Sequence, residues 1–545
     1  MKIKCLLPML FIGFGVTLTA QDTSPENWFN LDPKTDNVPG VSTEKMYQEL
    51  LGGRESETVI VAVIDSGVDP DHEDLKDVMW VNEDEIPGNG IDDDNNGYID
   101  DIHGWNFIGG KDGKNINHES LEITRLVAKY QKIYDGVDAN SLSKKQRVEY
   151  DAYQTMKEEI EEKKNSVMGQ AAGVMQFAEG IKMLTEHFGK SPSLAELKAL
   201  DGDETLKTVG QQVAGILEGQ GVTFDELKEN IEGAKSYFDG QLNYYYNVDF
   251  DPRAEVVGDN YDDPYERDYG NNDIQGPDAG HGTHVAGIIA AARGNDVGIM
   301  GVADNVRIMS VRAVPDGDER DKDVANAIIY AVDNGASIIN MSFGKSYVWN
   351  KKVVDQAVKY AMKNDVLLVH AAGNDGKNTD VANNFPHDAF AKRGLFGPKM
   401  ASNWIEVGAL TYRGGADAPA GFSNYGKDNV DVFAPGYQIL STTPDQGYDK
   451  YSGTSMAAPV TAGVAAVLRS YFPELTAEQV KEIIEGSIIP QTQKVKQPGS
   501  GDLVPFSDLC KTGGVVNSYQ AVQKAKKTKG KKKIKKKKKA KVAVP

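Results

Sequence analysis

The sequence predicts an α/β protein with a doubly wound, mostly parallel sheet and an inserted helical subdomain. Thr58–Ile64 is a continuous β-branched run, which is typical of a buried parallel strand. From His281 onward, strand and helix patterns alternate, which favours a sheet covered by helices on both faces. Between these two parts the composition turns charged and helical, which predicts the insertion.

The elements of the sheet region follow one another in regular order. Apolar runs predict strands, and amphipathic stretches between them predict the covering helices. The expected strands after residue 281 are Val306–Val314, Ser337–Met341 and Val366–His370, and the expected helices are Val324–Asn334, Lys352–Lys363 and Ser455–Phe472.

Residues 118–246 are predicted to form the helical insertion. Ile123, Leu126, Val127, Tyr130 and Ile133 recur at helical spacing. Two capping boxes, Ser193 with Glu196 and Thr223 with Glu226, mark further helix starts. A flexible linker is the alternative, but the apolar period is too regular for one.

Composition limits the classes of protein that fit. The chain has 545 residues, 40% of them apolar, which is ample for a large core. The net charge is −20 although the C-terminal end is rich in lysine, so an acidic body carries a basic tail and is not a nucleic-acid-binding domain. Cys5 and Cys510 are the two cysteines, and Cys5 lies in the predicted leader, so bound calcium is one source of stability in place of disulfides.

The N-terminus is typical of a secretory signal peptide over residues 1–20. Lys2 and Lys4 precede a short apolar run from Leu6 to Val16, and small residues lead to a cleavage site near Ala20. The run is too short and too interrupted for a membrane span. We therefore expect a secreted, periplasmic or cell-surface protein.

Three short motifs carry catalytic residue types in the order Asp, His, Ser. They are Asp65-Ser66-Gly67, the segment from His281 to Gly287, and Gly453-Thr454-Ser455. Alone, each has a plain structural explanation: a β-turn, a structural or metal-binding histidine pair, and a helix N-cap. Together they supply a buried acid, a general base and a hydroxyl nucleophile.

This combination resembles the subtilisin-like (subtilase, S8-type) serine peptidases of bacteria, with a large insertion between the Asp and the His. The resemblance implies that Ser455 is the nucleophile, His281 the general base and Asp65 its orienting acid, and that His284 is a packing residue. It also implies that Asn374, at the end of Ala371-Ala372-Gly373-Asn374, stabilises the oxyanion. The implied substrate-binding residues are Ser342, Phe343, Gly344, Ala372 and Gly373.

The resemblance divides the chain into parts around the peptidase domain. After the signal peptide comes a lead-in, residues 21–57, with a helical stretch near Thr43–Leu51. The expected parts are then 58–117 (first part of the peptidase domain, with a calcium loop), 118–246 (insertion), 247–523 (second part) and 524–545 (disordered Lys-rich tail).

A calcium loop is predicted between residues 89 and 101. Asp92, Asp94 and Asn96 take positions 1, 3 and 5 of an EF-hand-type loop, and a glycine follows. The Tyr98 carbonyl and Asp100 come next, but position 12 is His103 rather than Glu, so Asp101 is the expected substitute carboxylate. A solvated acidic turn is the alternative.

A second calcium site is implied by the resemblance. Its ligands would be Asp74, the Asn295 side chain and the carbonyls of Val297 and Ile299, although Gly294 departs from the family pattern. The acidic stretch Asp249–Asp273 either holds another cation or is a solvated loop, and the second interpretation is favoured.

The function expected is that of an exported, calcium-stabilised serine endopeptidase that hydrolyses proteins or peptides through an acyl-enzyme. The alternative is a surface-binding protein on a subtilisin-like scaffold, with restricted or latent proteolysis. The lead-in is shorter than the usual family prosegment, so the enzyme folds unaided or the insertion restrains it.

Two charged segments leave alternatives open. The Lys-rich tail is a solvated segment, an anchor to an anionic surface polymer or lipid, or a nucleic-acid arm; the anchor is weakly favoured and no specific nucleic acid is predicted. The loop with Asp316, Asp318, Glu319 and Asp321 either selects basic residues in the substrate or is simply solvated, and solvation is favoured.

Overall fold

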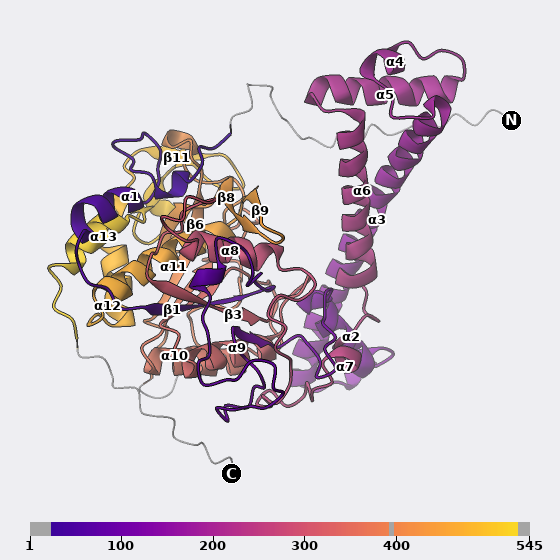
Figure 1. The fold of residues 1–545 in the computed structure, drawn as a ribbon. Coiled ribbons are helices and arrows are strands. Elements are labelled where there is room, and N and C mark those ends of the chain that lie inside the picture. Colours follow the sequence, from indigo (N-terminus) through magenta and orange to yellow (C-terminus); the bar gives the residue numbers. More distant parts are fainter. Residues whose placement is uncertain (1–22, 392–396, 532–545) are drawn as a thin grey trace. The chain divides into compact units, whose positions relative to one another are not determined.

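The computed structural model describes residues 23–391 and 397–531. The described chain folds into two compact units (Figure 1). One comprises Ile123–Phe250, and the other, called the body below, comprises Ser24–Glu122 and the chain from Asp251 onward. The predicted signal peptide, residues 1–20, lies outside the described residues.

The body is built on a central sheet that has nine strands in the described chain. Their order is β10-β13-β7-β6-β5-β4-β1-β3-β2, and neighbours are parallel except for β10 and β13. The strands are β1 (Val59–Asp65), β2 (Gly104–Asn106), β3 (Val306–Arg312), β4 (Ile338–Met341), β5 (Leu367–Ala371), β6 (Trp404–Leu410), β7 (Val432–Pro435), β10 (Ile489–Pro490) and β13 (Gly514–Val515). Two smaller antiparallel pairs are β8 (Ile439–Thr443) with β9 (Gly447–Tyr451) and β11 (Lys494–Lys496) with β12 (Leu503–Pro505).

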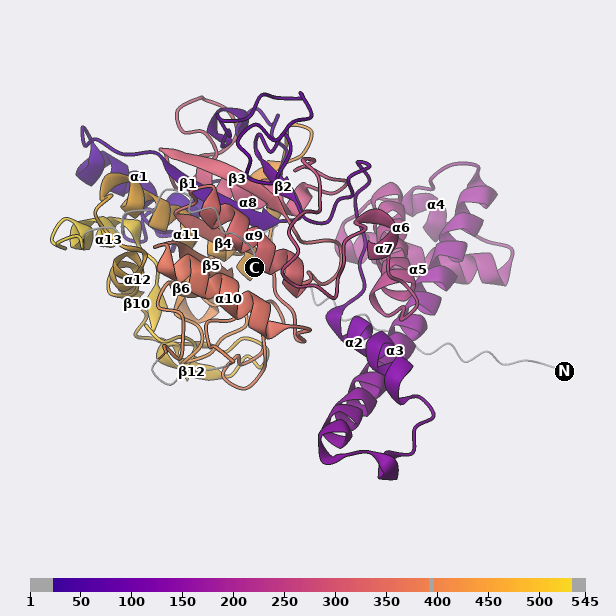
Figure 2. The ribbon, with the colours of Figure 1, turned by 90° about the horizontal axis from the view of Figure 1, so that it is seen from below.

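Helices cover both faces of the sheet, so each strand is apolar on both sides. In β1, Val61 and Val63 pack into the same core as α8 and α11, whereas Ala62 and Ile64 pack into the core of α9 and α10. Figure 2 shows α9 and α10 running together along one face. The body helices are α1 (Thr43–Met46), α7 (Arg253–Val256), α8 (Gly280–Ala290), α9 (Asp321–Asp333), α10 (Lys351–Lys363), α11 (Thr454–Tyr471), α12 (Ala477–Glu485) and α13 (Ser518–Ala525).

The strand order reverses at β1, which lies between β3 and β4. Asp65 is the last residue of β1 and pairs in register with Arg312 of β3. Open parallel sheets place their ligand sites beyond the carboxyl ends of the strands at such a reversal. The predicted fold class, including the inserted helical subdomain, is confirmed.

The helical unit has a core of its own. Leu184, Leu197, Val213 and Phe224 are buried together from four of its helices. Both predicted capping boxes are present, with Ser193 and Thr223 as N-caps. The helices are α2 (Glu122–Tyr134), α3 (Lys144–Phe188), α4 (Leu194–Lys198), α5 (Glu204–Gln220) and α6 (Phe224–Gly240), followed by a π-helical turn at Gln241–Tyr245.

The start of the Lys-rich tail differs from the expectation. Residues 524–531 are not a disordered segment: Ala525 is buried in the body core, and the Lys529 carbonyl accepts a hydrogen bond from Gln479 of α12 at 3.0 Å. The apolar stems of lysines can pack while their ammonium groups stay solvated. The tail from residue 532 lies outside the described residues. Within the described part, no helix has the length and apolar character needed to cross a membrane.

Candidate active site

Asp65 and His281 form a close pair beyond the end of β1. The Nδ1 atom of His281, in the first turn of α8, lies 2.7 Å from Oδ1 of Asp65. The Asp65 side chain is 2% exposed and that of His281 is 38% exposed. The approach depends on Gly282, because a Cβ there would lie 2.1 Å from the Gly67 carbonyl oxygen.

The charge of Asp65 controls the protonation of His281. Burial disfavours the imidazolium, but the charge of Asp65 and its hydrogen bond outweigh burial and raise the pKa of His281 above its ordinary value of 6.5. A raised pKa makes the imidazole a stronger proton acceptor, as a general base requires.

Ser455 lies at the start of α11. Its Oγ donates a hydrogen bond to the Ser342 carbonyl at 3.0 Å, and Ser342 Oγ donates to the Ser455 carbonyl at 2.8 Å. Within the described residues no hydrogen bond joins Ser455 to His281. In this structure the Ser455 hydroxyl is therefore hydrogen-bonded to the segment after β4 and not to the imidazole.

Asn374 lies beside the same helix start. Its Oδ1 accepts hydrogen bonds from the backbone N–H of Thr454 at 2.8 Å and from Thr454 Oγ1 at 3.1 Å. Because both bonds are made by Oδ1, the Nδ2 group is left as a donor on an exposed side chain. The Ser455 N–H lies in the first turn of α11, where backbone N–H groups lack carbonyl partners from a preceding turn.

The two predicted substrate segments follow neighbouring strands. Ser342–Gly344 continues β4, and Ala372–Gly373 continues β5, which is parallel to β4. Asn384 lies between them: its Nδ2 donates to the carbonyls of Ala371 and Ala372, at 3.1 and 3.0 Å. A pocket of about 260 Å³ adjoins the Asp65–His281 pair, and its lining includes Asp278, Asp316 and Ser342.

His284, the second histidine of the motif, has a structural environment. Its Nε2 lies 3.0 Å from the Ile439 carbonyl oxygen, and its ring stacks on Tyr451 at 4.3 Å between centroids. Burial lowers the pKa of His284 to about 3. The ring is thus a neutral packing group, which disfavours the metal-pair alternative.

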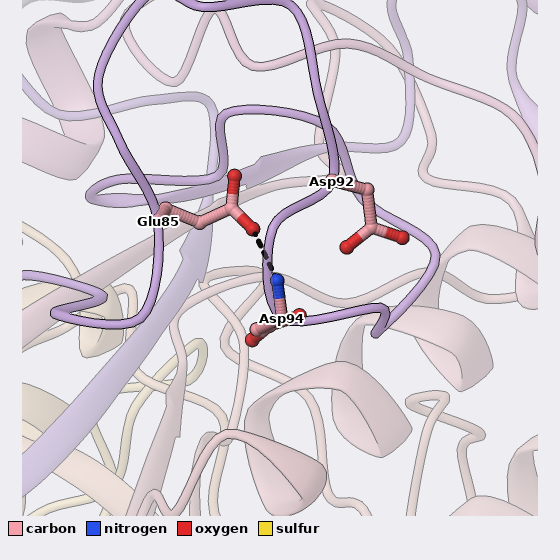
Figure 3. A group of neighbouring side chains, drawn as sticks. All are labelled: Glu85, Asp92 and Asp94. Carbon is pink, nitrogen blue, oxygen red and sulfur yellow. Dashed lines mark hydrogen bonds between the residues drawn. The ribbon is translucent and has the colours of Figure 1, made fainter.

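The predicted calcium loop brings some of its carboxylates together. Within the described residues, the one group of three acidic or metal-ligating side chains close enough to share an ion is Glu85, Asp92 and Asp94. Figure 3 shows them converging from two stretches of the loop, with Glu85 Oε1 accepting the Asp94 N–H at 3.1 Å. Glu85 was missed in the sequence because it precedes the motif, and its closeness arises only in the fold.

Other predicted ligands of this loop have different partners. Asp100 accepts the backbone N–H groups of Asn89 and Gly90. Asp101 is buried and accepts the Tyr330 hydroxyl at 2.6 Å, and burial raises its pKa to about 6. Asn96 links Asp94, of the group with Glu85 and Asp92, to Asp101, since its Nδ2 donates hydrogen bonds to both carboxylates. Tyr98 is buried, with its ring against Trp105.

Residues of the second predicted calcium site meet in the structure. Asn295 Nδ2 lies 2.7 Å from Oδ1 of the buried Asp74, and the Ile299 N–H donates to Asp74 Oδ2 at 3.1 Å. Val297 N–H donates to Asn295 Oδ1 at 3.2 Å. Asp74 therefore accepts hydrogen bonds from both ends of the segment 295–299.

Two expectations about solvated acids are wrong for particular residues, although Asp316 in the first loop and Asp262 and Asp263 in the stretch Asp249–Asp273 are exposed. Glu319 and Asp321 are buried, not solvated. Asp321 Oδ1 lies 2.9 Å from the Lys345 ammonium, which also donates a hydrogen bond to the backbone carbonyl of Glu319 at 2.7 Å. The side chain of Asp259, in the acidic stretch Asp249–Asp273, is also buried and pairs with Arg253 at 2.8 Å and Lys322 at 2.6 Å. Buried carboxylates need such partners.

Comparison with known proteins identifies the family. The subtilase family (Peptidase S8) matches residues 56–520, and the chain belongs to it. A thermophilic serine proteinase of Bacillus sp. (strain AK1) is 40% identical over 258 residues, covering 47% of this chain and 55% of the relative. Thermitase of Thermoactinomyces vulgaris is 36% identical over 245 residues, covering 45% of this chain and 75% of thermitase.

Two further matches are one sequence and one solved structure. Fervidolysin of Fervidobacterium pennivorans is 33% identical over 305 residues, which cover 51% of this chain and 39% of fervidolysin. A solved structure of a protease from Pseudoalteromonas arctica PAMC 21717 is 29% identical, covers 47% of this chain and 80% of that chain, and has a TM-score of 0.38. The chain thus spans about half, or less, of the length of two of these relatives.

Proposed function

We propose that the protein is an exported, calcium-stabilised serine endopeptidase that cuts peptide bonds through an acyl-enzyme intermediate. The observation that carries the proposal is the Asp65–His281 pair at 2.7 Å on the carboxyl side of the sheet. Membership in the subtilase family supports the same activity.

In the proposed mechanism, the Ser455 hydroxyl turns from the Ser342 carbonyl to Nε2 of His281. Its oxygen attacks the substrate carbonyl carbon while His281 accepts the proton, and Asp65 stabilises the imidazolium. The Asn374 Nδ2 group and the N–H of Ser455 donate to the oxyanion. The tetrahedral intermediate collapses, and His281 protonates the leaving amine. Water, activated by His281, then releases the acyl group from Ser455.

The substrate is proposed to be an extended protein or peptide segment. Ser342–Gly344 continues β4, and we propose that an extended segment of the substrate pairs with its backbone. The backbone N–H and carbonyl groups of Ala372 and Gly373 already have partners within the body, so this segment is proposed to line the site rather than to pair with the substrate. Labelling by a fluorophosphonate probe tests the site as a whole. The intact protein should be labelled and the Ser455→Ala variant should not; an intact protein that resists the probe would contradict the proposal.

Calcium is proposed to bind at Glu85, Asp92 and Asp94, and at the loop around Asp74. Members of the family commonly bind structural calcium. The donors in both places are oxygen atoms, which suit this hard cation, and three converging carboxylates repel one another unless a cation neutralises them.

Removing calcium should lower stability. A ligand at a hundred times its Kd adds about 2.7 kcal/mol per site, so the unfolding temperature should fall when EGTA replaces calcium. The Glu85→Gln/Asp94→Asn double variant should lose the shift assigned to the first site. Equal unfolding temperatures in calcium and EGTA would show that neither loop holds a stabilising ion.

Export is proposed from the leader-like sequence of residues 1–20. Cleavage near Ala20 would remove Cys5 and leave Cys510 as the sole cysteine of the mature chain. N-terminal sequencing of protein recovered from outside the producing cells should begin close to Gln21. A mature protein that begins at Met1 would contradict this.

A further inference from the structure

A buried lysine directly follows the predicted substrate segment Ser342–Gly344. The Lys345 side chain is 1% exposed. Its ammonium lies 2.6 Å from Oε2 of Glu122 and 2.9 Å from Oδ1 of Asp321, and it donates to the Glu319 carbonyl at 2.7 Å. The end of the substrate segment is therefore fixed by charge rather than by apolar packing.

Glu122 is the last residue of the body before the helical unit begins. Its side chain is fully buried, and its N–H donates to Asp318 at 2.8 Å. In the same loop, Arg320 Nη2 lies 2.7 Å from Glu119 and 2.9 Å from Asp251, one on each side of the insertion. We call this set of charges, from residues 119–122, 251 and 318–321, the insertion root.

Lys345 is also linked, through Phe385 and Asn384, to the second predicted substrate segment, Ala372–Gly373. Its backbone exchanges two hydrogen bonds with Phe385, at 2.9 and 2.8 Å, and Phe385 follows Asn384. Asn384 holds the carbonyls of Ala371 and Ala372. Gly344 packs so closely that a Cβ there would lie 2.5 Å from Asn384 Oδ1. A shift of Lys345 would therefore move both predicted substrate segments, Ser342–Gly344 and Ala372–Gly373.

We propose that Lys345 is a positioning residue for substrate binding, and that the insertion root, through Glu122 and Asp321, sets the place of the substrate-binding edge. The inference rests on the proposed peptidase function. A buried ammonium that loses a carboxylate partner must move or be neutralised. An edge displaced in this way loses backbone hydrogen bonds to an extended peptide. Ser342, at the other end of this segment, is hydrogen-bonded to Ser455, so we expect the nucleophile to be affected less than the binding of the peptide.

The test is made on the full chain with Lys345→Met and the isosteric Glu122→Gln. We expect the KM for a tetrapeptide p-nitroanilide to rise on the order of tenfold, with a smaller change in kcat, because misplacement of a binding segment has effects of this size or more. The rate of fluorophosphonate labelling should stay near that of the unmodified protein. A merely structural role would change stability without this separation of KM from kcat.

Lys322→Met is the matched control. Lys322 is another buried lysine, paired with Asp259 at 2.6 Å and Glu266 at 2.8 Å, but it lies on α9 and not on the substrate edge. It should lower the unfolding temperature and leave KM unchanged. Unchanged KM in both Lys345→Met and Glu122→Gln, or an equal rise in Lys322→Met, would overturn the inference.

The affinity of the same tetrapeptide p-nitroanilide, measured in a Ser455→Ala background, compares substrate binding among the variants without turnover. A weaker Kd in the Lys345 and Glu122 variants would support the positioning role even if the unmodified protein failed to react with the probe. An equal Kd in all variants would overturn it. Failure of the peptidase proposal and failure of this inference are thus separate results.

Discussion

Replacing Ser455 by alanine should lower kcat for peptide hydrolysis on the order of 10⁶-fold, the loss known for the nucleophile of subtilisin. The hydroxyl oxygen forms the covalent bond of the acyl-enzyme, and no other group in the described site can replace it. Steady-state hydrolysis of a fluorogenic peptide measures the loss. The fold should persist, because Ser455 is only half-buried and the Oγ makes one hydrogen bond, to Ser342.

Asn374→Ala is the graded control for this result. It removes one oxyanion donor and leaves the nucleophile, so kcat should fall by about 10²–10³-fold. The hydrogen bonds from Thr454 to Asn374 would also be lost, so the unfolding temperature should be recorded beside the rate. Ser455→Ala that retains more activity than Asn374→Ala would contradict the assignment of the nucleophile.

Replacing Asp65 by asparagine should lower kcat by about 10⁴-fold and shift the pH dependence. The amide no longer fixes the tautomer of His281 or stabilises its imidazolium. Only the neutral imidazole can accept the Ser455 proton, so kcat/KM rises as the pH increases through the pKa of His281. With Asp65 present this pKa is above 6.5. In the variant the charge of Asp65 is lost and its hydrogen bond is weakened, while burial and the charge of Asp278 remain, so the midpoint moves to lower pH.

The pH profile of kcat/KM, recorded for both proteins on one substrate, measures this shift. A Glu44→Gln variant, which removes a carboxylate that pairs with Arg293 elsewhere in the body, is a suitable control and should leave the midpoint in place. A midpoint that stays put or rises in Asp65→Asn would show that Asp65 does not raise the pKa of His281.

Sequence alone predicted the fold class, and it placed Asp65 at a strand end and Ser455 at a helix start, because these signals are local. Asp65 ends an apolar strand, and Ser455 begins a helix, so chain position and element boundary coincide. The helical insertion was equally visible, since helical period and capping boxes are read within a few residues.

What the sequence did not reveal depends on partners that are remote along the chain. Glu85 reaches Asp94 through a turn of the loop. Lys345 and Glu122 are 223 residues apart in the sequence, with the whole insertion between them. An acidic residue such as Asp259 is predicted to be solvated unless a cationic partner is known. Only the fold identifies Lys322 as that partner. The docked start of the tail has the same cause, because its acceptor and donor Gln479 is distant in sequence.

The placement of Arg320 has a consequence for the integrity of the chain. One guanidinium holds Glu119 and Asp251, and β1, from before the insertion, lies between β3 and β4, from after it. The two sequence halves of the body are therefore interleaved and tied together independently of the peptide that links them. A single backbone cut within residues 123–250 leaves a two-chain body whose sheet and active-site residues stay assembled, so denaturing gels and native mass would give different answers for the same nicked molecule.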